Sequence, residues 1–442
     1  MGKDSGHMMG RRVIVIGAGA AGLVAAGQAA EAAGHARAAS EVVVLEKMTQ
    51  PGRKLRITGN GRCNLTNWDP LPEFIAQFGR NGRFLRSAFS QFFAPELVAL
   101  LKRIGVPTVT EGQGRVFPAS GRAQDVVDAL ARWAGAAGVR FATGSPAERL
   151  VVEDGRVTGV GVGGAEIHTC DAAILATGGA SYPATGSTGD GYRLATAVGH
   201  NIFPIRPALV PLETAGGVAR RLQGVSLGDV SVRVLVDGEP VAAGVGPSAP
   251  RGPGLGAARG EMLFTHFGVS GPVIIRVSNK AVDALVAGAG VTLSLDLAPD
   301  LAERDLDARL LEEFATHGRR KVGTVLGALL PGKMVDVFCD LAGVSPDKPA
   351  NQLTADERRR LREWLRDFRL EVTGHRGFNE AIVTAGGVDL REVDPRTMAS
   401  RLVKGLYFAG EVLDLDGASG GYNLQAAFST GWLAGHSAAL AT

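Results

Sequence analysis

A chain of 442 residues exceeds the usual size of one compact domain, so we expect more than one domain. Apolar residues make up 45% and charged residues 21%, which excludes an intrinsically disordered chain. Lys and Arg number 47 against 44 Asp and Glu, and this small excess argues against a basic face built for phosphate backbones.

Cysteine usage indicates the redox setting. The three cysteines, Cys63, Cys170 and Cys339, lie far apart and form no CxxC pair. This spacing argues against a disulfide framework, a zinc ribbon or a dithiol redox centre, and it is typical of a reducing compartment. We predict no metal site.

The N-terminal stretch resembles an export signal only superficially. Arg11 and Arg12 precede an uncharged stretch from Val13 to Ala30. That stretch is too rich in Gly and Ala for strong membrane insertion, and no other segment approaches about 20 uninterrupted apolar residues. We therefore expect a soluble, cytoplasmic protein. Residues 1–9 resemble a vector remnant and are left out of the fold prediction.

The first elements predict the opening of a parallel sheet. Residues 13–16 are β-branched and predict a buried strand, and the Ala-rich stretch 20–33 predicts a helix that ends at Gly34. A second strand is expected over 41–45, just before Glu46. A strand, a helix and a strand in this order are typical of a parallel sheet with helical crossovers.

The rest of the chain divides into two parts that differ in their predicted secondary-structure elements. Up to about residue 200 we predict a helix over 123–137, a hairpin of strands 149–152 and 157–162, a buried strand over 172–175 and a helix over 191–198. From Pro204 onward we predict a hairpin of 230–236 with 240–243, strands over 291–297, 369–372, 381–384 and 406–409, and helices over 301–314, over 354–368 and from about 423.

Two segments of the second part carry further expectations. Residues 244–260 are rich in Gly, Pro and Ala, and no strand precedes their GxGxG string, so we predict a flexible loop and no second nucleotide site. The helix over 354–368 would place Leu361, Trp364, Leu365 and Phe368 on one face, with Arg358–Arg360 solvated and not contacting RNA.

The first chemical motif is a GxGxxG sequence, residues 17–22, at the first strand–helix turn. Gly17 permits the tight turn, Gly19 lets the backbone approach a pyrophosphate, and Gly22 allows close helix–strand packing. The helix start, with Ala20 and Ala21, offers free N–H groups to phosphates. The carboxylate of Glu46 can accept hydrogen bonds from both hydroxyls of an adenosine ribose. A plain Gly-rich turn is the alternative reading of the glycines alone.

Two later strand ends complete a set of three elements. The strand 172–175 continues into Ala176, Thr177 and Gly178, and the strand 406–409 ends at Gly410 and Glu411, where a carboxylate could receive a hydrogen bond from a polyol chain. The following turn enters a helix whose free N–H groups could face the anionic edge of a reduced flavin, through residues Gly421, Tyr422, Asn423 and Leu424. An NAD dehydrogenase needs the first element alone, whereas an FAD enzyme of the two-dinucleotide-binding superfamily uses all three.

A fourth motif covers residues 52–67. Arg53 and Lys54 could neutralise a pyrophosphate or a bound anion, and the Gly/Asn turn that follows carries Arg62, Cys63 and Asn64, which could lie against the isoalloxazine. An ordinary polar loop remains an equal alternative for these residues. Cys63 is disfavoured as a nucleophile because no nearby His or second Cys would activate it.

The chain resembles the bacterial BaiN/YhiN-type flavoproteins, which are NAD(P)/FAD-dependent or aminoacetone-oxidase-like oxidoreductases. The resemblance runs from Val13 to Gly435 and rests on GRKLRITGNGRCNLTN, GRVFPASGRAQDVV, LATGGASYPATGSTGDGY, GEMLFTHFGVSGP and the long run from Ala381 to Ala427. It implies a discontinuous FAD-binding domain (10–205 and 385–442) interrupted by an insert (206–384) that combines a small β-barrel with a helical part at about 299–368. The expected fold class is therefore α/β with a Rossmann-like FAD domain.

A broader similarity extends to fumarate reductase and ketosteroid dehydrogenase flavoproteins. They share a Thr177-Gly178-Gly179 turn followed by a sequence like Thr188–Gly191. Their C-terminal segment differs from residues 416–423 of this chain, so we expect a relation in fold and not in function.

We therefore predict an FAD-dependent oxidoreductase in which flavin N5 accepts or donates a hydride. Lys47 and Ala147 complete the predicted cofactor contacts. Arg62, Asn64 and His266 are predicted for a substrate cleft between the two domains, although a hydrogen-bonded structural histidine is the alternative for His266. NAD(P)H, if used as electron donor, would dock without a domain of its own. We expect a small-molecule substrate; an FAD enzyme acting on tRNA and a flavin-binding interaction protein without turnover are the alternatives.

Overall fold

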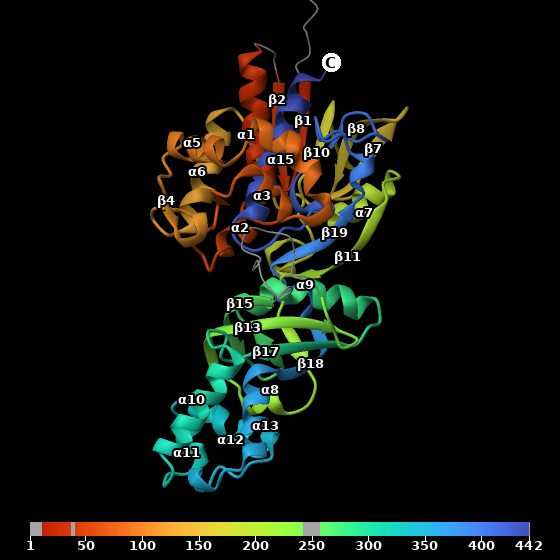
Figure 1. Cartoon of the computed structure of the whole chain (residues 1–442). Helices are drawn as coiled ribbons and strands as arrows, with labels where there is room; N and C mark the ends of the chain where they lie inside the picture. The colour runs from red at the N-terminus through yellow and green to blue at the C-terminus, as the bar shows by residue number, and fades with distance from the viewer. Residues whose placement is uncertain (1–10, 37–39, 242–256, 442) are drawn as a thin grey trace, which may run out of the picture. The chain divides into compact units, whose positions relative to one another are not determined.

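The computed structural model describes residues 11–36, 40–241 and 257–441 (Figure 1). The chain forms two compact units. The discontinuous unit comprises residues up to Arg206 and from Ile382 onward, and the inserted unit comprises Pro207–Ala381. Each unit has its own hydrophobic core.

A five-stranded parallel sheet forms the centre of the discontinuous unit. The strand order is β20 (Leu406–Phe408), β10 (Ala172–Leu175), β1 (Arg11–Ile16), β2 (Ser40–Glu46) and β6 (Arg140–Thr143). The β-branched side chains of β1 are fully buried, as expected for a strand covered on both faces. The predicted strands over 13–16, 41–45 and 172–175 are confirmed.

Two long helices of small residues pack against each other in this unit (Figure 1). They are α1 (Ala20–His35) and α15 (Tyr422–Leu440). A methyl group added at Gly431 would lie 2.3 Å from the Ala21 carbonyl oxygen, so the two backbones approach too closely for larger residues. The Gly and Ala content of residues 13–30 therefore serves packing. Within the described residues, no helix is long and apolar enough to cross a membrane.

Smaller elements surround this core. They are α2 (Arg53–Ile57), β3 (Thr66–Asn67), α3 (Leu71–Ala76), η1 (Gly79–Leu85), α4 (Arg86–Gln91), α5 (Ala94–Arg103), β4 (Thr108–Glu111), β5 (Arg115–Pro118), α6 (Ala123–Ala136), β7 (Ala147–Glu153), β8 (Arg156–Val162), β9 (Glu166–Thr169), α7 (Asp190–Ala197), β11 (Ile202–Ala208) and β19 (Val383–Val388). Strands β3, β5 and β4 form one antiparallel sheet, β7, β8 and β9 form another, and β11 pairs with β19.

The inserted unit contains a closed antiparallel barrel. Six strands follow each other around it, in the order β13 (Ser226–Val236), β15 (Ala257–Phe264), β16 (Gly268–Ser270), β12 (Leu212–Thr214), β18 (Phe368–His375) and β17 (Val291–Asp296), and the pairing of β17 with β13 closes the ring. The unit also contains β14 (Glu239–Pro240) and the helices α8 (Val218–Arg221), α9 (Pro272–Val286), α10 (Glu303–Thr316), α11 (Val322–Leu326), α12 (Gly332–Ala342) and α13 (Ala355–Arg366). The mixed α/β class with a Rossmann-like sheet and a barrel is confirmed.

Three local predictions need correction. Residues 257–260 of the predicted loop belong to β15, because they pair with β13; residues 244–256 lie outside the described residues. The helix predicted over 354–368 ends at Arg366, and Phe368 begins β18 opposite Leu295. Helix α9 is absent from the prediction, although Pro272 follows Gly271 and apolar residues recur at helical spacing.

A buried histidine joins two loops of the discontinuous unit. The His200 side chain is fully buried, its Nδ1 lies 3.1 Å from Glu392 Oε2 and its Nε2 lies 2.8 Å from Ser400 Oγ. Burial lowers the pKa of His200, and the neighbouring Glu392 only partly opposes this.

The stability of the protein should consequently depend on pH through His200. Because the pKa is lower in the folded state, the unfolded state takes up the proton first, and the free energy of unfolding should fall as the pH drops below about 6.5. Denaturant unfolding between pH 7 and pH 5.5 should show this loss in the wild type and a smaller loss in His200→Gln. The exposed His35→Gln is the control. Equal pH dependence in all three proteins would contradict the prediction.

Candidate flavin site

The GxGxxG turn has the geometry that a pyrophosphate requires. Gly17 has a φ of +100°, and a methyl group on it would lie 2.6 Å from the Ala176 carbonyl oxygen. A methyl group on Gly22 would lie 1.8 Å from the Gly17 carbonyl oxygen, whereas one on Gly19 would meet nothing within 4 Å. Gly17 and Gly22 are thus fixed by packing, while Gly19 leaves space in front of the start of α1, which Ala20 and Ala21 form.

Glu46 holds the turn beside this space. Its Oε2 accepts a hydrogen bond from the Ala18 N–H and its Oε1 accepts one from the Met48 N–H, both at 2.8 Å. A carboxylate offers about four acceptor positions, so acceptor capacity remains for the two hydroxyls of a ribose.

The predicted contacts Lys47 and Ala147 lie near the same strand end. The Lys47 ammonium donates to Asp190 Oδ2 at 2.5 Å and also to Thr188 Oγ1, so it holds the loop before α7. The Ser145 N–H donates to the Glu46 carbonyl oxygen at 2.9 Å, which places the start of β7, and hence Ala147, beside the end of β2.

The second and third elements meet at the carboxyl edge of the sheet. The Lys54 ammonium donates to Glu411 Oε2 at 2.7 Å and to Ser181 Oγ at 2.6 Å. An added methyl on Gly178 would lie 4.0 Å from Glu411 Oε2, so the turn of Thr177 and Gly178 borders the same carboxylate. Arg53 is exposed and forms no ion pair within the described residues.

Sequence reasoning missed two residues that hold Glu411. Thr384 is fully buried; its N–H donates to Glu411 Oε1 at 2.7 Å, and its Oγ1 accepts from the Ala180 N–H at 2.8 Å. The Ser181 hydroxyl donates to the same Glu411 Oε1 at 3.1 Å. Both residues stand inside the motifs that carry the family resemblance, so the signal was present, but only the fold shows that they act on one carboxylate.

The start of α15 packs against β3. Gly421 has a φ of +103°, and a methyl on it would lie 2.5 Å from the Thr66 backbone. The Asn423 side chain bonds the backbone of Gly417 and Ala418 at 2.8–3.1 Å, and the Tyr422 hydroxyl lies 2.7 Å from Asp69 Oδ2. Leu424 is partly buried against the core, and Gly410 donates its N–H to Thr430. The turn that opens this helix is therefore held from both sides.

The 58–67 turn holds the residues predicted to face the substrate. Arg62 pairs with Glu111, and its guanidinium lies 4.4 Å from the centre of the Phe117 ring. The Asn64 Oδ1 atom is buried and has no hydrogen-bond partner within the described residues. A buried acceptor without a donor costs free energy, so Asn64 fits a site that receives a donor from a bound molecule.

Cys63 is buried in the same turn with a φ of +62°. Burial raises the pKa of its thiol to about 12, so a thiolate does not form near neutral pH. Cys63→Ser should therefore keep FAD bound and lose little flavin reduction by NAD(P)H, measured by absorbance under anaerobic conditions. A thiolate–flavin charge-transfer band in the wild type that disappears in the variant would show that thiol chemistry operates.

His266 lies in the inserted unit, between β15 and β16. Its ring is exposed and contacts Phe267 edge to face at 5.1 Å, and it forms no side-chain hydrogen bond within the described residues. The alternative of a hydrogen-bonded structural histidine is therefore not supported. The predicted residues of the discontinuous unit are brought together around one edge of its parallel sheet, whereas His266 belongs to the inserted unit.

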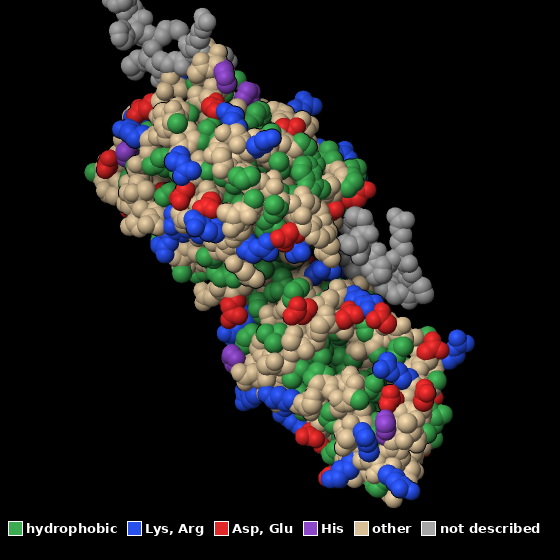
Figure 2. All heavy atoms as spheres, turned by 90° about the vertical axis from the view of Figure 1, so that its left-hand side faces the viewer, with side chains coloured by type: hydrophobic (Ala, Val, Ile, Leu, Met, Phe, Trp, Pro, Cys, Tyr) green, Lys and Arg blue, Asp and Glu red, His purple; other side chains and the backbone are tan. Residues whose placement is uncertain are grey.

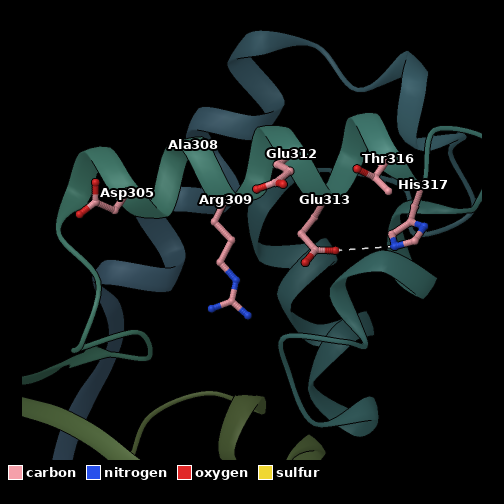
Figure 3. Close-up of a pocket in the computed structure, with 7 residues that line it drawn as sticks. All are labelled: Asp305, Ala308, Arg309, Glu312, Glu313, Thr316 and His317. Atoms are coloured by element: carbon pink, nitrogen blue, oxygen red, sulfur yellow. Dashed lines mark ion pairs between the residues drawn. The ribbon is translucent and has the colours of Figure 1, made fainter.

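A hollow of about 520 Å³ lies elsewhere, along α10 in the inserted unit (Figure 3). One face of a single helix lines it, and Glu313 and His317 form an ion pair of 3.8 Å there. It contains none of the predicted cofactor contacts. No cluster of three or more His, Cys, Asp or Glu that could hold a metal occurs in the described part of the chain.

The residues at the sheet edge fit an FAD molecule. The open space at Gly19 would take the pyrophosphate, Glu46 would accept from the adenosine ribose, and Glu411 would face the ribityl chain. The Gly421 turn and Asn64 would lie at the isoalloxazine. Glu46 and Glu411 place an acceptor at each of two strand ends, which suits the hydroxyl groups of that cofactor. The open helix start between them suits the negative charge of its pyrophosphate.

The fold and this site define the class of protein: it is an FAD-dependent oxidoreductase of the Rossmann type. The chain belongs to the family described as "HI0933-like protein Rossmann domain", whose model matches residues 11–437. Membership confirms the resemblance seen in the sequence.

Two relatives are similar over nearly their whole length. The ribosomal RNA dihydrouridine synthase of Escherichia coli K12 is 32% identical over 95% of this chain and 96% of its own. The 3-dehydro-bile acid delta(4,6)-reductase of Clostridium scindens is 32% identical over 97% of this chain and 99% of its own.

Solved structures are less similar to this chain in sequence. The 3-ketosteroid delta1-dehydrogenase of Sterolibacterium denitrificans aligns over 97% of this chain and 99% of its own, with 15% identity and a TM-score of 0.49. The 3-ketosteroid-delta4-(5alpha)-dehydrogenase of Rhodococcus jostii aligns over 97% of both chains, with 16% identity and a TM-score of 0.46.

Proposed function

We propose that this protein catalyses the flavin-dependent reduction of a carbon–carbon double bond conjugated to a carbonyl group, with NAD(P)H as electron donor. The observation that carries the proposal is what the two relatives share. A dihydrouridine synthase saturates the ring double bond of uridine, and a bile acid delta(4,6)-reductase saturates double bonds of a steroid. Their substrates differ in size and charge, but both bonds are polarised by a neighbouring carbonyl.

Bound FAD would supply the redox chemistry, a hydride for the β carbon of the substrate, and the α carbon would take a proton from solvent. The polypeptide would position the flavin and the substrate, and it would supply the electric field around them. The free N–H groups at the start of α15 would stabilise negative charge on the flavin edge that they face. The Lys54–Glu411 pair, held by Thr384 and Ser181, would fix the ribityl chain and so the distance between flavin and substrate.

The substrate side would be formed by the 58–67 turn. Asn64 presents an acceptor without a partner, which suits an N–H or O–H of the substrate. Arg62 is held in place by Glu111 and Phe117, and its remaining N–H groups would donate to a carbonyl oxygen of the substrate. A hydrogen-bond donor at that oxygen would favour the addition of hydride to the double bond, because it would stabilise the negative charge that develops on the carbonyl oxygen.

The test is a two-step anaerobic experiment on the purified holoprotein. NADPH or NADH should reduce the flavin, and 2-cyclohexenone or uridine should then reoxidise it and gain two hydrogen atoms by mass spectrometry. Cyclohexene, which has no carbonyl, is the matched control and should leave the flavin reduced. If neither carbonyl compound is reduced and the flavin is reoxidised only after oxygen is admitted, the result would contradict the proposal and indicate an oxidase.

A further inference from the structure

We propose that Asn67 and Asp69 (the β3 pair) are positioning residues of the flavin site. They hold the start of α15 against the end of the 58–67 turn, and they thereby set the electric field at the flavin edge and the distance from the flavin to the substrate. This role rests on the proposed function, which assigns the flavin edge to the start of α15 and the substrate to the 58–67 turn. Both residues act through the helix start and not on the reacting atoms.

The surface charge singles out no partner on the face drawn in Figure 2, where cationic and acidic side chains are mostly interspersed. The interior of the discontinuous unit, by contrast, holds a buried polar side chain whose position the cofactor contacts leave unexplained. That side chain is Asn67, the last residue of the 52–67 motif.

Asn67 joins three segments by hydrogen bonds. It ends β3 and is 2% exposed. Its Nδ2 donates to the Gln113 carbonyl oxygen at 3.0 Å and to the Gly420 carbonyl oxygen at 3.2 Å, and its Oδ1 accepts from the Asp69 N–H at 3.0 Å. The amide thus uses both donor hydrogens and an acceptor position, as a buried amide requires. One of its partners lies 353 positions further along the chain, in the turn that opens α15.

Asp69 holds the same helix start through a side chain of α15. Its Oδ2 accepts a hydrogen bond from the hydroxyl of Tyr422, the first residue of α15, at 2.7 Å. The Tyr422 ring is 8% exposed and contacts Phe74 edge to face, with 4.7 Å between the ring centres. Because this packing fixes the direction of the ring, the bond to Asp69 also fixes the position of the helix start.

The backbones leave little room for movement between β3 and α15. Gly421 approaches the Thr66 backbone so closely that an added methyl group would lie 2.5 Å from it. The turn that opens α15 therefore contacts the 66–69 segment at three consecutive positions of its own. Asn64 lies two positions before Thr66 in the same unit. A shift of the helix start against β3 would consequently change the distance between the flavin edge and Asn64.

The charge of Asp69 allows its bond and its field to be tested separately. The start of a helix carries a partial positive charge, which stabilises the negative charge of a reduced flavin. If the start of α15 moves away, the flavin becomes harder to reduce. The Asp69 carboxylate has the opposite sign, so removal of its charge alone should make the flavin easier to reduce. Loss of the bond and loss of the charge are therefore expected to act in opposite directions.

The experiment measures the ratio of reduced to oxidised flavin in the holoprotein, at anaerobic equilibrium with a reference dye. Asn67→Ala and Tyr422→Phe each break a contact to the helix start and should lower this ratio about 2–5-fold, the effect of a helix terminus on a nearby charge. Asp69→Asn still offers an acceptor to the Tyr422 hydroxyl and should raise the ratio. The matched control Asn279→Ala removes an asparagine bond to the Leu209 N–H within the inserted unit and should leave the ratio unchanged.

A second measurement follows the reoxidation of the reduced flavin by 2-cyclohexenone. A flavin displaced from the 58–67 turn should transfer hydride on the order of 10-fold more slowly in Asn67→Ala and Tyr422→Phe. The concentration of 2-cyclohexenone that gives half of the maximal rate should change little, because neither substitution removes a contact to the substrate. Asn279→Ala should reoxidise at the wild-type rate.

The outcomes separate this inference from the proposed function. Folded Asn67→Ala and Tyr422→Phe proteins with the wild-type ratio would overturn the positioning role, and intact reduction of 2-cyclohexenone would leave the proposed function standing. An equal change in Asn279→Ala, or a lower ratio in Asp69→Asn, would also overturn it. A wild-type protein that does not reduce 2-cyclohexenone would contradict the proposed function, but the dye equilibrium needs no substrate and still decides the positioning role. If Asn67→Ala does not bind FAD, the milder Tyr422→Phe and Asp69→Asn decide it.

Discussion

Replacing Glu46 by alanine should weaken FAD binding by roughly 10–100-fold, since charged hydrogen bonds contribute on the order of 1.5–3 kcal/mol. The carboxylate is expected to accept from the ribose, and it already accepts from the Ala18 and Met48 N–H groups. The variant would therefore lose the ribose contacts and loosen the turn before α1 as well. Fluorescence titration of the apoprotein with FAD measures the change.

The control for this prediction is Glu41→Ala. Glu41 lies near the start of β2, the opposite end from Glu46, and its carboxylate pairs with Arg12 and Arg140. It should leave FAD affinity unaltered. Unchanged affinity in a folded Glu46→Ala protein would mean that Glu46 does not contact the ribose.

Three glycines of α1 and its entry should respond to alanine in three different ways. Gly22→Ala places a methyl 1.8 Å from the Gly17 carbonyl oxygen, so the free energy of unfolding should fall by about 1–3 kcal/mol or more even without cofactor. Gly19→Ala meets no atom of the protein and should leave apoprotein stability unchanged. Its methyl would occupy the path of the pyrophosphate, so FAD affinity should fall on the order of 10-fold or more.

Gly34→Ala is the control within the same helix. Nothing lies within 4 Å of the added methyl, and alanine favours the helix by up to about 1 kcal/mol over glycine. Denaturant unfolding of the apoproteins and FAD titration together separate packing from cofactor contact. Equal FAD affinity in Gly19→Ala and wild type would place the pyrophosphate elsewhere.

Much of the cofactor site could be predicted because its determinants are local. The turn at Gly17, Gly19 and Gly22 needs particular backbone conformations within six residues, and Glu46 ends the next strand in the sequence. The second and third elements followed from the strand ends at 172–178 and 406–411, and the resemblance added the interrupted domain. By contrast, the predicted role of Lys47 at the cofactor remains a prediction, since its ammonium pairs with Asp190 and Thr188.

Local sequence patterns predicted the wrong secondary structure at positions where pairing with a distant strand determines it. Residues 257–260 lack β-branched side chains and read as loop, but β13 supplies the hydrogen bonds that make them a strand. Phe368 continues a helical pattern, yet its backbone pairs with Leu295 in the barrel. In both places the partner strand lies tens of residues away, and no local propensity contains that contact.

The sequence by itself determined the Rossmann-like class, the GxGxxG turn and the family, because these depend on short spacings and residue types. Only the tertiary structure decided that Lys54, Ser181, Thr384 and Glu411 form one hydrogen-bonded group. The four come from segments up to 357 positions apart. Lys54, Ser181 and Glu411 meet because they follow β2, β10 and β20, whose carboxyl ends lie at a common edge of the parallel sheet. Thr384 joins them from β19, which pairs with β11 outside that sheet, so only the tertiary structure brings it to the same carboxylate.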